Sequence, residues 1–371
     1  MCRQLKLLLD RKMNRKFSVL FFFAALIWGV SAYAGSDSAL NRFFDNWDDW
    51  TISRLDTDYV TLPSQWWRVG LLGAWQNTNI NVTDYSMMYG MFGNADSDRK
   101  MKLGLQGSFR GWGASYSFEL GGSDRLFNFL YFGNSFGIEF VDNRTHSLNG
   151  NIDAYAWGLD ADYGFVPNET PIQILKDDIL HHCIFVDGYY VFNSRQFSLP
   201  AAMDQSYLQK KSAGSILLGA AYVYNDFVYS KNSDFFSISG VENITISEFT
   251  FGGGYGYNFA YRLMQNSHFL VHFSLLPMIS VWNRFHVKTD EHSLAAGLNG
   301  SQKHGHYWIW DDFKNDHLQL VWFYRSSFTF SYKNFYIGVK AEIVRQYLTK
   351  DDGLDLETDV LNIHSFAGIR F

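Results

Sequence analysis

Histidine and serine, the residue types that serve as base and nucleophile in hydrolases, are adjacent at several places in the sequence. The two pairs considered as catalytic candidates are His146–Ser147 and His292–Ser293. Neighbouring residues on a strand point to opposite faces, so adjacency alone does not bring a base to its nucleophile. We assign no nucleophile elbow and no catalytic residue. The two serines remain the best candidates for an enzymatic alternative.

The run His181-His182-Cys183 contains three residue types that bind metals. On a strand, only His181 and Cys183 would share a face, and we identify no further ligand. Gly252-Gly253-Gly254 is rich in glycine like a phosphate-binding loop, but no Lys-Ser/Thr pair and no helix pattern follow it. Glycines inside a strand more often allow bending or the close approach of a neighbour or plug. We therefore expect no metal and no cofactor.

The composition limits the class of protein. The chain has 371 residues, 18% of them aromatic, and 31 basic against 37 acidic side chains. Its mean hydropathy is only -0.16, whereas a helical membrane protein would contain several apolar runs of about 20 residues. The acidic balance gives no support to nucleic-acid binding. The apolar residues must therefore be interleaved with polar ones in a folded chain.

Residues 1–34 have the three parts of an export signal. Residues 13–16 begin a basic stretch, residues 17–30 are apolar, and Ala32-Tyr33-Ala34 is a small-x-small cleavage site. We expect this signal to be removed after export. Cys183 is then the single cysteine of the mature chain, so no internal disulfide is expected.

From residue 66 onward, apolar and polar residues alternate with a period of two, which predicts strands with one apolar and one polar face. In the last strand, Leu361, Ile363, Ala367, Ile369 and Phe371 alternate with polar residues and glycine. We predict twelve strands, near residues 66–78, 101–110, 112–120, 125–132, 136–143, 178–192, 213–229, 245–259, 268–285, 318–331, 335–347 and 360–371.

The connections between these strands are mostly short and long in turn, as in an outer-membrane β-barrel. The exceptions are the brief connection 121–124 and the long connection 193–212. A sheet spans lipid only if it closes, because every backbone polar group must be paired. We therefore predict an all-β fold, a transmembrane antiparallel barrel of about twelve strands in the cell outer membrane, with its apolar residues forming an outer wall rather than a core. A soluble, secreted all-β protein is the alternative.

The predicted barrel covers residues 66–371, and residues 35–65 form a periplasmic N-terminal segment. Within that segment, apolar residues at roughly helical spacing predict a short amphipathic helix near 38–55. This helix either packs against the body of the protein or lies on the membrane surface. Its acidic face favours the first arrangement.

If the apolar faces point outward, charged residues of both signs line the lumen. They either pair across the lumen and stiffen the wall, or they line a path for a small solute. These candidate lumen residues are Lys102, Glu119, Glu139, His272, Arg284, Arg325, Lys340, Glu342, His364 and Arg370.

The long connection 193–212 lies on what should be the short-turn side, which faces the periplasm. It is polar and has three interpretations: a constriction inside the lumen, a docking site for a periplasmic partner, or a structural turn that closes the barrel end. Its candidate residues are Arg195, Gln205, Gln209, Lys210 and Lys211.

The chain ends on an aromatic residue that closes an alternating strand. Phe371 resembles the C-terminal signature read by the barrel-assembly machinery. The expected partners are therefore membrane lipid and this machinery, together with a small solute or a periplasmic partner.

The stretch from Gly188 to Ser215 includes Tyr-Val-Phe-Asn at 190–193 and Ser-Ala-Gly-Ser at 212–215. It resembles a family of uncharacterised exported proteins from Bacteroidota, the domain of unknown function forty-four twenty-one. The likeness extends through residues 252–258 and 275–277 over most of the mature chain. This resemblance implies an outer-membrane setting and brings no catalytic residues. The sequence favours a narrow channel or a structural or binding component of the envelope, with an enzyme acting on lipid or glycan as the alternative.

Overall fold

The computed structural model describes most of the chain after residue 52. The described residues are 46, 53–84, 89–97, 101–146, 148–157, 165–167, 172–233, 241–264, 266–289, 303–308, 319–349 and 354–371. The chain divides into two compact units, Met1–Arg54 and Leu55–Phe371. The predicted export signal and nearly all of the predicted helix near 38–55 lie outside the described residues. Among the residues that are described, no helix has the length and apolar character to cross a membrane.

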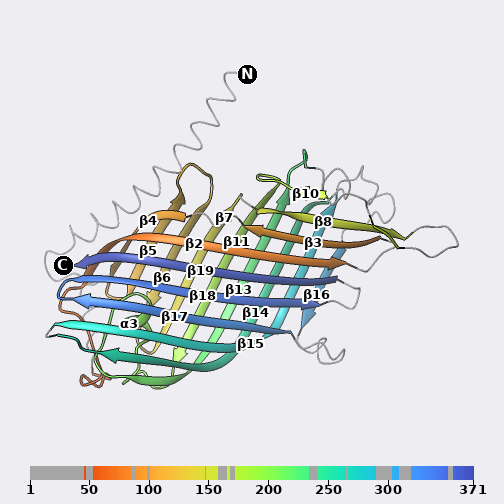
Figure 1. Ribbon diagram of the computed structural model, residues 1–371. Coiled ribbons are helices and arrows are strands. Elements are labelled where there is room, and N and C mark those ends of the chain that lie inside the picture. The colour runs from red at the N-terminus through yellow and green to blue at the C-terminus, as the bar shows by residue number, and fades with distance from the viewer. Residues whose placement is uncertain are drawn as a thin grey trace. The chain divides into compact units, whose positions relative to one another are not determined.

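Twelve antiparallel strands form a closed ring in the second unit, which confirms the predicted fold class (Figure 1). The ring closes because the last strand pairs with the first from Leu354–Asp84 to Arg370–Arg68. In ring order the strands are β2 (Trp67–Asp84), β4 (Met101–Phe109), β5 (Trp112–Glu119), β6 (Arg125–Phe132), β7 (Phe136–Thr145), β11 (Ile179–Val191), β13 (Ala213–Tyr229), β14 (Val241–Tyr261), β15 (Ser267–Thr289), β17 (Leu320–Tyr332), β18 (Phe335–Thr349) and β19 (Leu354–Arg370).

The two ends of the ring differ. At one end the strands are joined by short turns and by the connection 192–212, which contains α3 (Leu199–Met203) and β12 (Leu208–Gln209). β1 (Val60–Thr61) pairs with β12 at this end. At the other end the longer connections carry additional strands of the sheet, namely β3 (Tyr89–Ser97), β8 (Leu148–Trp157), β9 (Phe165–Pro167), β10 (Ile172–Ile174) and β16 (Lys303–Trp308).

Side chains alternate between the two faces of the barrel wall. On β17, Trp322 and Phe328 are exposed, whereas Arg325, Ser327 and Thr329 are buried. This polarity is the reverse of that of a water-soluble protein, and it is the arrangement of a barrel surrounded by lipid. Every ring strand contributes at least one exposed large apolar residue; one from each strand, in ring order, is Leu71, Leu105, Phe118, Phe129, Ile138, Tyr190, Ile216, Phe251, Phe273, Phe328, Ile337 and Ile369.

Exposed aromatic residues gather at the short-turn end of the wall. Aromatic rings prefer the boundary between hydrocarbon and water because they combine an apolar body with a polar or polarisable edge. These residues therefore mark one edge of the apolar surface. They are Trp112, Phe136, Tyr190, Phe192, Phe259, Tyr261, Tyr332, Phe335 and Phe371.

A β-bulge corrects one predicted lumen residue. Thr250 pairs with Ser280 and Phe249 pairs with Trp282, so Val281 is an extra residue on β15. An inserted residue reverses the alternation beyond it. Asn283 is consequently buried and Arg284 is exposed. The prediction that Arg284 faces the lumen is therefore wrong.

The exposed apolar surface generates a test of the lipid setting. Leu105 lies at the centre of β4 and its side chain is 58% exposed. We expect Leu105→Arg to lower the free energy of unfolding in lipid vesicles by about 2–4 kcal/mol, because the guanidinium would enter hydrocarbon. Denaturant titration of the protein folded in vesicles measures this change.

Asn94→Arg is the matched control, since Asn94 is exposed on β3 beyond the ring. Its effect should stay within about 0.5 kcal/mol, as for ordinary surface substitutions. Equally small effects of both substitutions would contradict the interpretation that the exposed apolar residues of the outer wall face lipid.

Candidate functional site

The connection between β11 and β13 folds inside the barrel at its short-turn end. We call residues 193–212 the plug. Its helix α3 starts after Ser198, whose hydroxyl accepts a hydrogen bond from the Ala201 backbone N–H at 3.2 Å. Pro200 lies in the first turn, where its missing N–H has no cost. All five residues of α3 are buried, although the helix is too short to be stable alone.

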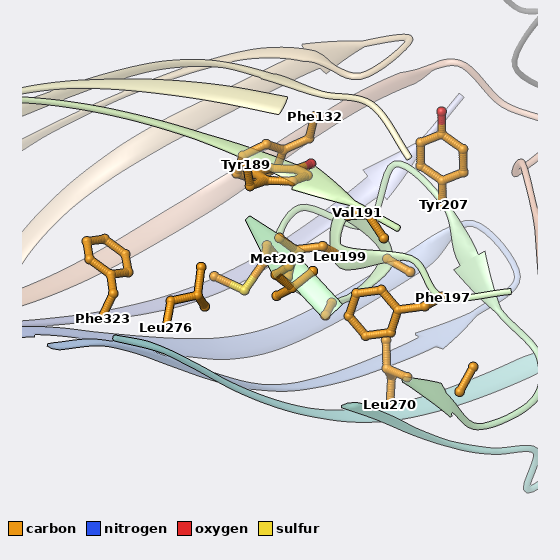
Figure 2. Packing of buried hydrophobic residues seen from close by; sticks show 14 of the residues in the cluster. Phe132, Tyr189, Val191, Phe197, Leu199, Met203, Tyr207, Leu270, Leu276 and Phe323 are labelled. Carbon is orange, nitrogen blue, oxygen red and sulfur yellow. The ribbon is translucent and has the colours of Figure 1, made fainter. Parts of the chain in front are cut away.

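Apolar contacts hold the plug against the inner wall (Figure 2). Phe197, Leu199 and Met203 of the plug belong to one buried cluster. The wall side of this cluster includes Phe132, Tyr189, Val191, Leu217, Leu270, Leu276 and Phe323. The barrel therefore has an apolar core as well as an apolar outer wall, which corrects the expectation of an outer wall alone. The inward positions of the strands are apolar where the plug covers them, because they face protein instead of water.

One glycine of β14, Gly256, makes room for the plug. A Cβ on Gly256 would lie 3.1 Å from the ring of Phe197 and 3.1 Å from Leu217. A larger residue at this position would push the plug away from the wall. The prediction for Gly252-Gly253-Gly254, bending or the close approach of a neighbour or plug, concerned other glycines of this strand. At Gly252 and Gly254 the close neighbour is β15, because a Cβ there would meet the backbone carbonyls of Pro277 and Leu275.

Two arginines at the seam of the barrel bind the plug. Arg68 on β2 and Arg370 on β19 are opposite each other in the pairing that closes the ring. Arg68 forms an ion pair with Asp204, with Nη2 and Oδ2 3.0 Å apart, and donates a further hydrogen bond to the Asp204 carbonyl. Neither Arg68 nor Asp204 was among the residues predicted from the sequence. The position of Arg68 two residues into the first alternating strand was a usable signal, whereas no local pattern indicated its partner.

Gln205 connects the plug to the second arginine. Its backbone is left-handed, with a φ of 64°. Its side-chain oxygen accepts hydrogen bonds from Arg370 Nη2 at 3.0 Å and from Ser331 Oγ at 2.6 Å. Its nitrogen donates to Thr329 Oγ1 at 2.9 Å. The plug is therefore joined to β17 and β19 through one buried amide.

Gln209 holds the plug together internally. Its side-chain oxygen accepts from the Ser198 backbone N–H at 2.9 Å and from Asn258 Nδ2 at 3.1 Å. Its nitrogen donates to the carbonyls of Gln196 and Lys211 at 2.6 and 2.8 Å. Both predicted glutamines thus have structural positions inside the barrel.

The three predicted basic residues of this connection remain on the surface. Arg195, Lys210 and Lys211 are all exposed. Lys210 Nζ donates to the Thr57 carbonyl at 2.9 Å, and Lys211 Nζ lies 3.1 Å from Asp58 Oδ2. These two lysines tie the segment before β2 to the plug.

Farther from the short-turn end, charged side chains cross the lumen. Arg325 on β17 pairs with Asp187 on β11, and its Nε lies 3.4 Å from Glu342 Oε1. Lys340 on β18 lies 3.7 Å from Glu139 on β7. β11 and β17, like β7 and β18, are not neighbours in the ring. Arg325, Lys340 and Glu139 therefore form ion pairs across the lumen, whereas Glu342 pairs with Arg325 on the neighbouring strand. Asp187 was not among the predicted lumen residues, although alternation along β11 indicates its inward position.

An aromatic contact lies in the same region. Phe185 on β11 stacks on Phe323 on β17 with ring centroids 5.5 Å apart. Arg325 lies over the Phe323 ring at 4.5 Å. A cation above an aromatic face in a dry environment is stabilised by the ring quadrupole. Ion pairs and rings together connect two distant parts of the wall.

The remaining predicted lumen residues are buried in separate polar contacts. Lys102 Nζ donates to Asn143 Oδ1 at 2.9 Å and to Gln76 Oε1 at 3.2 Å. The backbone N–H of Asp124 donates to Glu119 Oε2 at 3.4 Å. The ring nitrogens of His272 lie 2.8 Å from Asn258 Oδ1 and 3.0 Å from Ser274 Oγ. His364 is buried on β19.

The histidine–cysteine run has no metal-binding geometry among the described residues. His181 is buried, stacks on Phe227 and has Nε2 3.0 Å from Asn225 Oδ1. His182 points to the other face, 3.0 Å from Asp142. The two neighbours therefore serve different surfaces of one strand.

The catalytic candidates gain no support from the described residues. Ser147 and Ser293 lie outside them. One Gly-x-Ser-x-Gly pattern, Gly133–Gly137, is present in the sequence although no nucleophile elbow was predicted from it. Ser135 lies there in the turn between two antiparallel strands, with its hydroxyl 3.1 Å from Ser194 Oγ. A nucleophile elbow joins a strand to a helix, so this pattern is a hairpin turn.

The ion pair between Arg68 and Asp204 predicts that a single substitution at Asp204 strongly lowers the free energy of unfolding. In Asp204→Asn, the amide nitrogen would face the Arg68 guanidinium, and a buried charge would lose its partner. We expect the free energy of unfolding to fall by about 3–5 kcal/mol. The control is Asp58→Asn, which breaks the exposed pair with Lys211 and should cost less than about 1 kcal/mol. If denaturant titrations showed equally small losses for the two variants, the Arg68–Asp204 ion pair would not be what holds the plug at the seam.

Comparison with curated proteins finds no match. Among solved structures, the outer membrane protease OmpT from Escherichia coli is 9% identical, with 83% of this chain and 97% of that chain covered and a TM-score of 0.40. The β domain of the Bordetella autotransporter BrkA is 10% identical, with 82% and 100% covered and a TM-score of 0.30. The P. putida toluene transporter TodX is 8% identical, with 83% and 91% covered and a TM-score of 0.22. These likenesses carry no argument about activity.

The sequence also matches a protein family over the whole barrel and the segment that precedes it from residue 54. The matched residues, 54–371, include every strand, the plug and the residues that bind the plug. The chain therefore belongs to the family described as Domain of unknown function (DUF4421).

Proposed function

We propose that this protein is an outer-membrane barrel closed by its own plug, and that it serves the bacterial envelope as a binding or structural component. The position of residues 193–212 inside the short-turn end of the barrel carries this proposal. An open channel would need a continuous path of water past this segment. The apolar cluster around Phe197 and Leu199 opposes such a path.

The outer surface supports the membrane part of the proposal. Each ring strand has an exposed apolar residue, and the ring leaves no free edge at the β19–β2 seam. Closed barrels with this polarity satisfy the backbone in hydrocarbon. The exposed C-terminal Phe371, whose backbone pairs with Trp67 at 3.0 and 3.2 Å, fits recognition of the last strand during assembly. That recognition is part of the proposal.

The lumen contacts support a permanently closed state. Arg68, Arg370 and Asn258 hold the plug from three strands, and the pairs Arg325–Asp187 and Lys340–Glu139 cross the barrel beyond it. Removing one member of a buried pair leaves an uncompensated charge. Opening would break several such contacts together.

A gated channel is the second candidate. The inward face toward the long-loop end is polar and includes Lys102, Asn143 and Asn225, as a solute path would require. In this case the plug would leave the lumen when a signal reached it.

Conductance in a planar bilayer tests the proposal. We expect no discrete current steps from the refolded full-length protein. Replacing residues 198–207 by a short Gly-Ser linker should produce steps, because it removes α3 and the residues that Arg68 and Arg370 bind. The matched control places the same linker in the connection 231–239, outside the lumen contacts described above, and should stay silent. Regular current steps from the unaltered protein would favour the channel.

A further inference from the structure

The connections at the two ends of the barrel carry opposite charge. At the short-turn end they contain six basic residues and a single acidic one, Asp204, which is already paired with Arg68. The segment before β2 adds Asp56 and Asp58 at this end, and Asp58 is paired with Lys211. At the long-loop end they contain seven basic and 17 acidic residues. The short-turn connections are 110–111, 133–135, 192–212, 262–266 and 333–334, and the long-loop connections are 85–100, 120–124, 146–178, 230–240, 290–319 and 350–353. The net charge of -6 is therefore unevenly distributed. We call the short-turn connections, which are basic, the short-turn rim.

Three basic residues of this rim stand beside aromatic rings. Arg262 directly follows Tyr261, which is 64% exposed. Lys333 lies 5.4 Å from the centroid of the Tyr332 ring, and Arg110 lies 4.8 Å from that of Trp66. Aromatic residues mark the depth of the lipid headgroups. The basic groups are consequently at the depth of the lipid headgroups, just beyond the exposed apolar surface of the outer wall.

The turn between β14 and β15 adds an apolar contact to this rim. Leu263 and Met264, next to Arg262, are 58% and 60% exposed. A purely aqueous turn would not favour two exposed large apolar residues beside a cation. Partial insertion among lipid headgroups would cover both residues and leave the guanidinium at the phosphates.

From this geometry we infer that the short-turn rim binds the phosphate groups of anionic phospholipids in the adjacent leaflet. The inference rests on the proposed membrane setting. Arg195, Arg262 and Lys333 are the main contacts, because all three are exposed and come from three different connections. Each basic group near an anionic surface contributes attraction that salt screens. The acidic connections at the other end disfavour the same lipids there, so the rim also orients the barrel.

Spin-labelled lipids provide the test. The full-length protein is reconstituted in phosphatidylcholine vesicles with a trace of spin-labelled phosphatidylglycerol or spin-labelled phosphatidylcholine. The lipid immobilised at the barrel surface is then measured by electron spin resonance. We expect a preference for phosphatidylglycerol of roughly threefold at low salt, which falls toward unity in about 1 M salt.

The triple variant Arg195→Gln, Arg262→Gln, Lys333→Gln should lose the preference. The matched control Lys176→Gln, Lys231→Gln, Lys288→Gln removes three exposed lysines at the other end and should retain it. A preference that persists in the first variant, or that is absent from a correctly inserted wild-type barrel, would overturn the inference. Insertion is monitored separately by heat-modifiable migration on a gel. Failure to insert at all would instead refute the membrane setting.

An acidic cell-wall polymer is the other chemistry that a basic rim could attract. Soluble cell-wall fragments added to the reconstituted protein serve as competitor. If they abolish the phosphatidylglycerol preference at low salt while added inorganic phosphate at equal ionic strength does not, the polymer is the occupant and the lipid inference is wrong.

Discussion

The pairing of β19 with β2 is the contact on which the other features of the barrel depend. Seventeen residue pairs join the two strands, from Leu354–Asp84 to Arg370–Arg68. Without this seam, the first and last strands would expose a row of unpaired backbone groups, which hydrocarbon does not tolerate. Closure also separates the side chains into an outer and an inner set, because their alternation then defines two continuous surfaces.

Closure creates a second requirement. The inward side chains have no contact with lipid, so they must pack against or pair with other parts of the protein. In this protein the plug fills the short-turn end with apolar side chains, and ion pairs bridge the lumen beyond it. Arg68 and Arg370 connect the closure of the ring to the filling of its interior. They face each other across the seam and both bind the plug. Closing the ring thereby builds the site that receives residues 204 and 205.

Much of the fold was accessible from the sequence. The twelve predicted strand segments match the twelve ring strands, with differences of a few residues at their ends and up to about six where strands continue into long connections. The inward positions of Arg325, Lys340 and Glu342 followed from alternation alone. The place of Arg284 did not, because one bulged residue at Val281 reverses the alternation beyond it. Nothing local in that strand distinguishes the bulge from continuous pairing.

The sequence by itself determined the strands, their apolar faces and the unusual length of the connection 193–212. The strands and their faces are short-range patterns with a period of two, and the long connection is an interruption of that pattern. Only the tertiary structure decided that this connection lies inside the barrel, and which charges meet there. Asp204 is 136 residues from Arg68, and Asp187 is 138 residues from Arg325. Such pairs depend on the curvature and register of a closed ring, which bring distant strands face to face and leave no local signal.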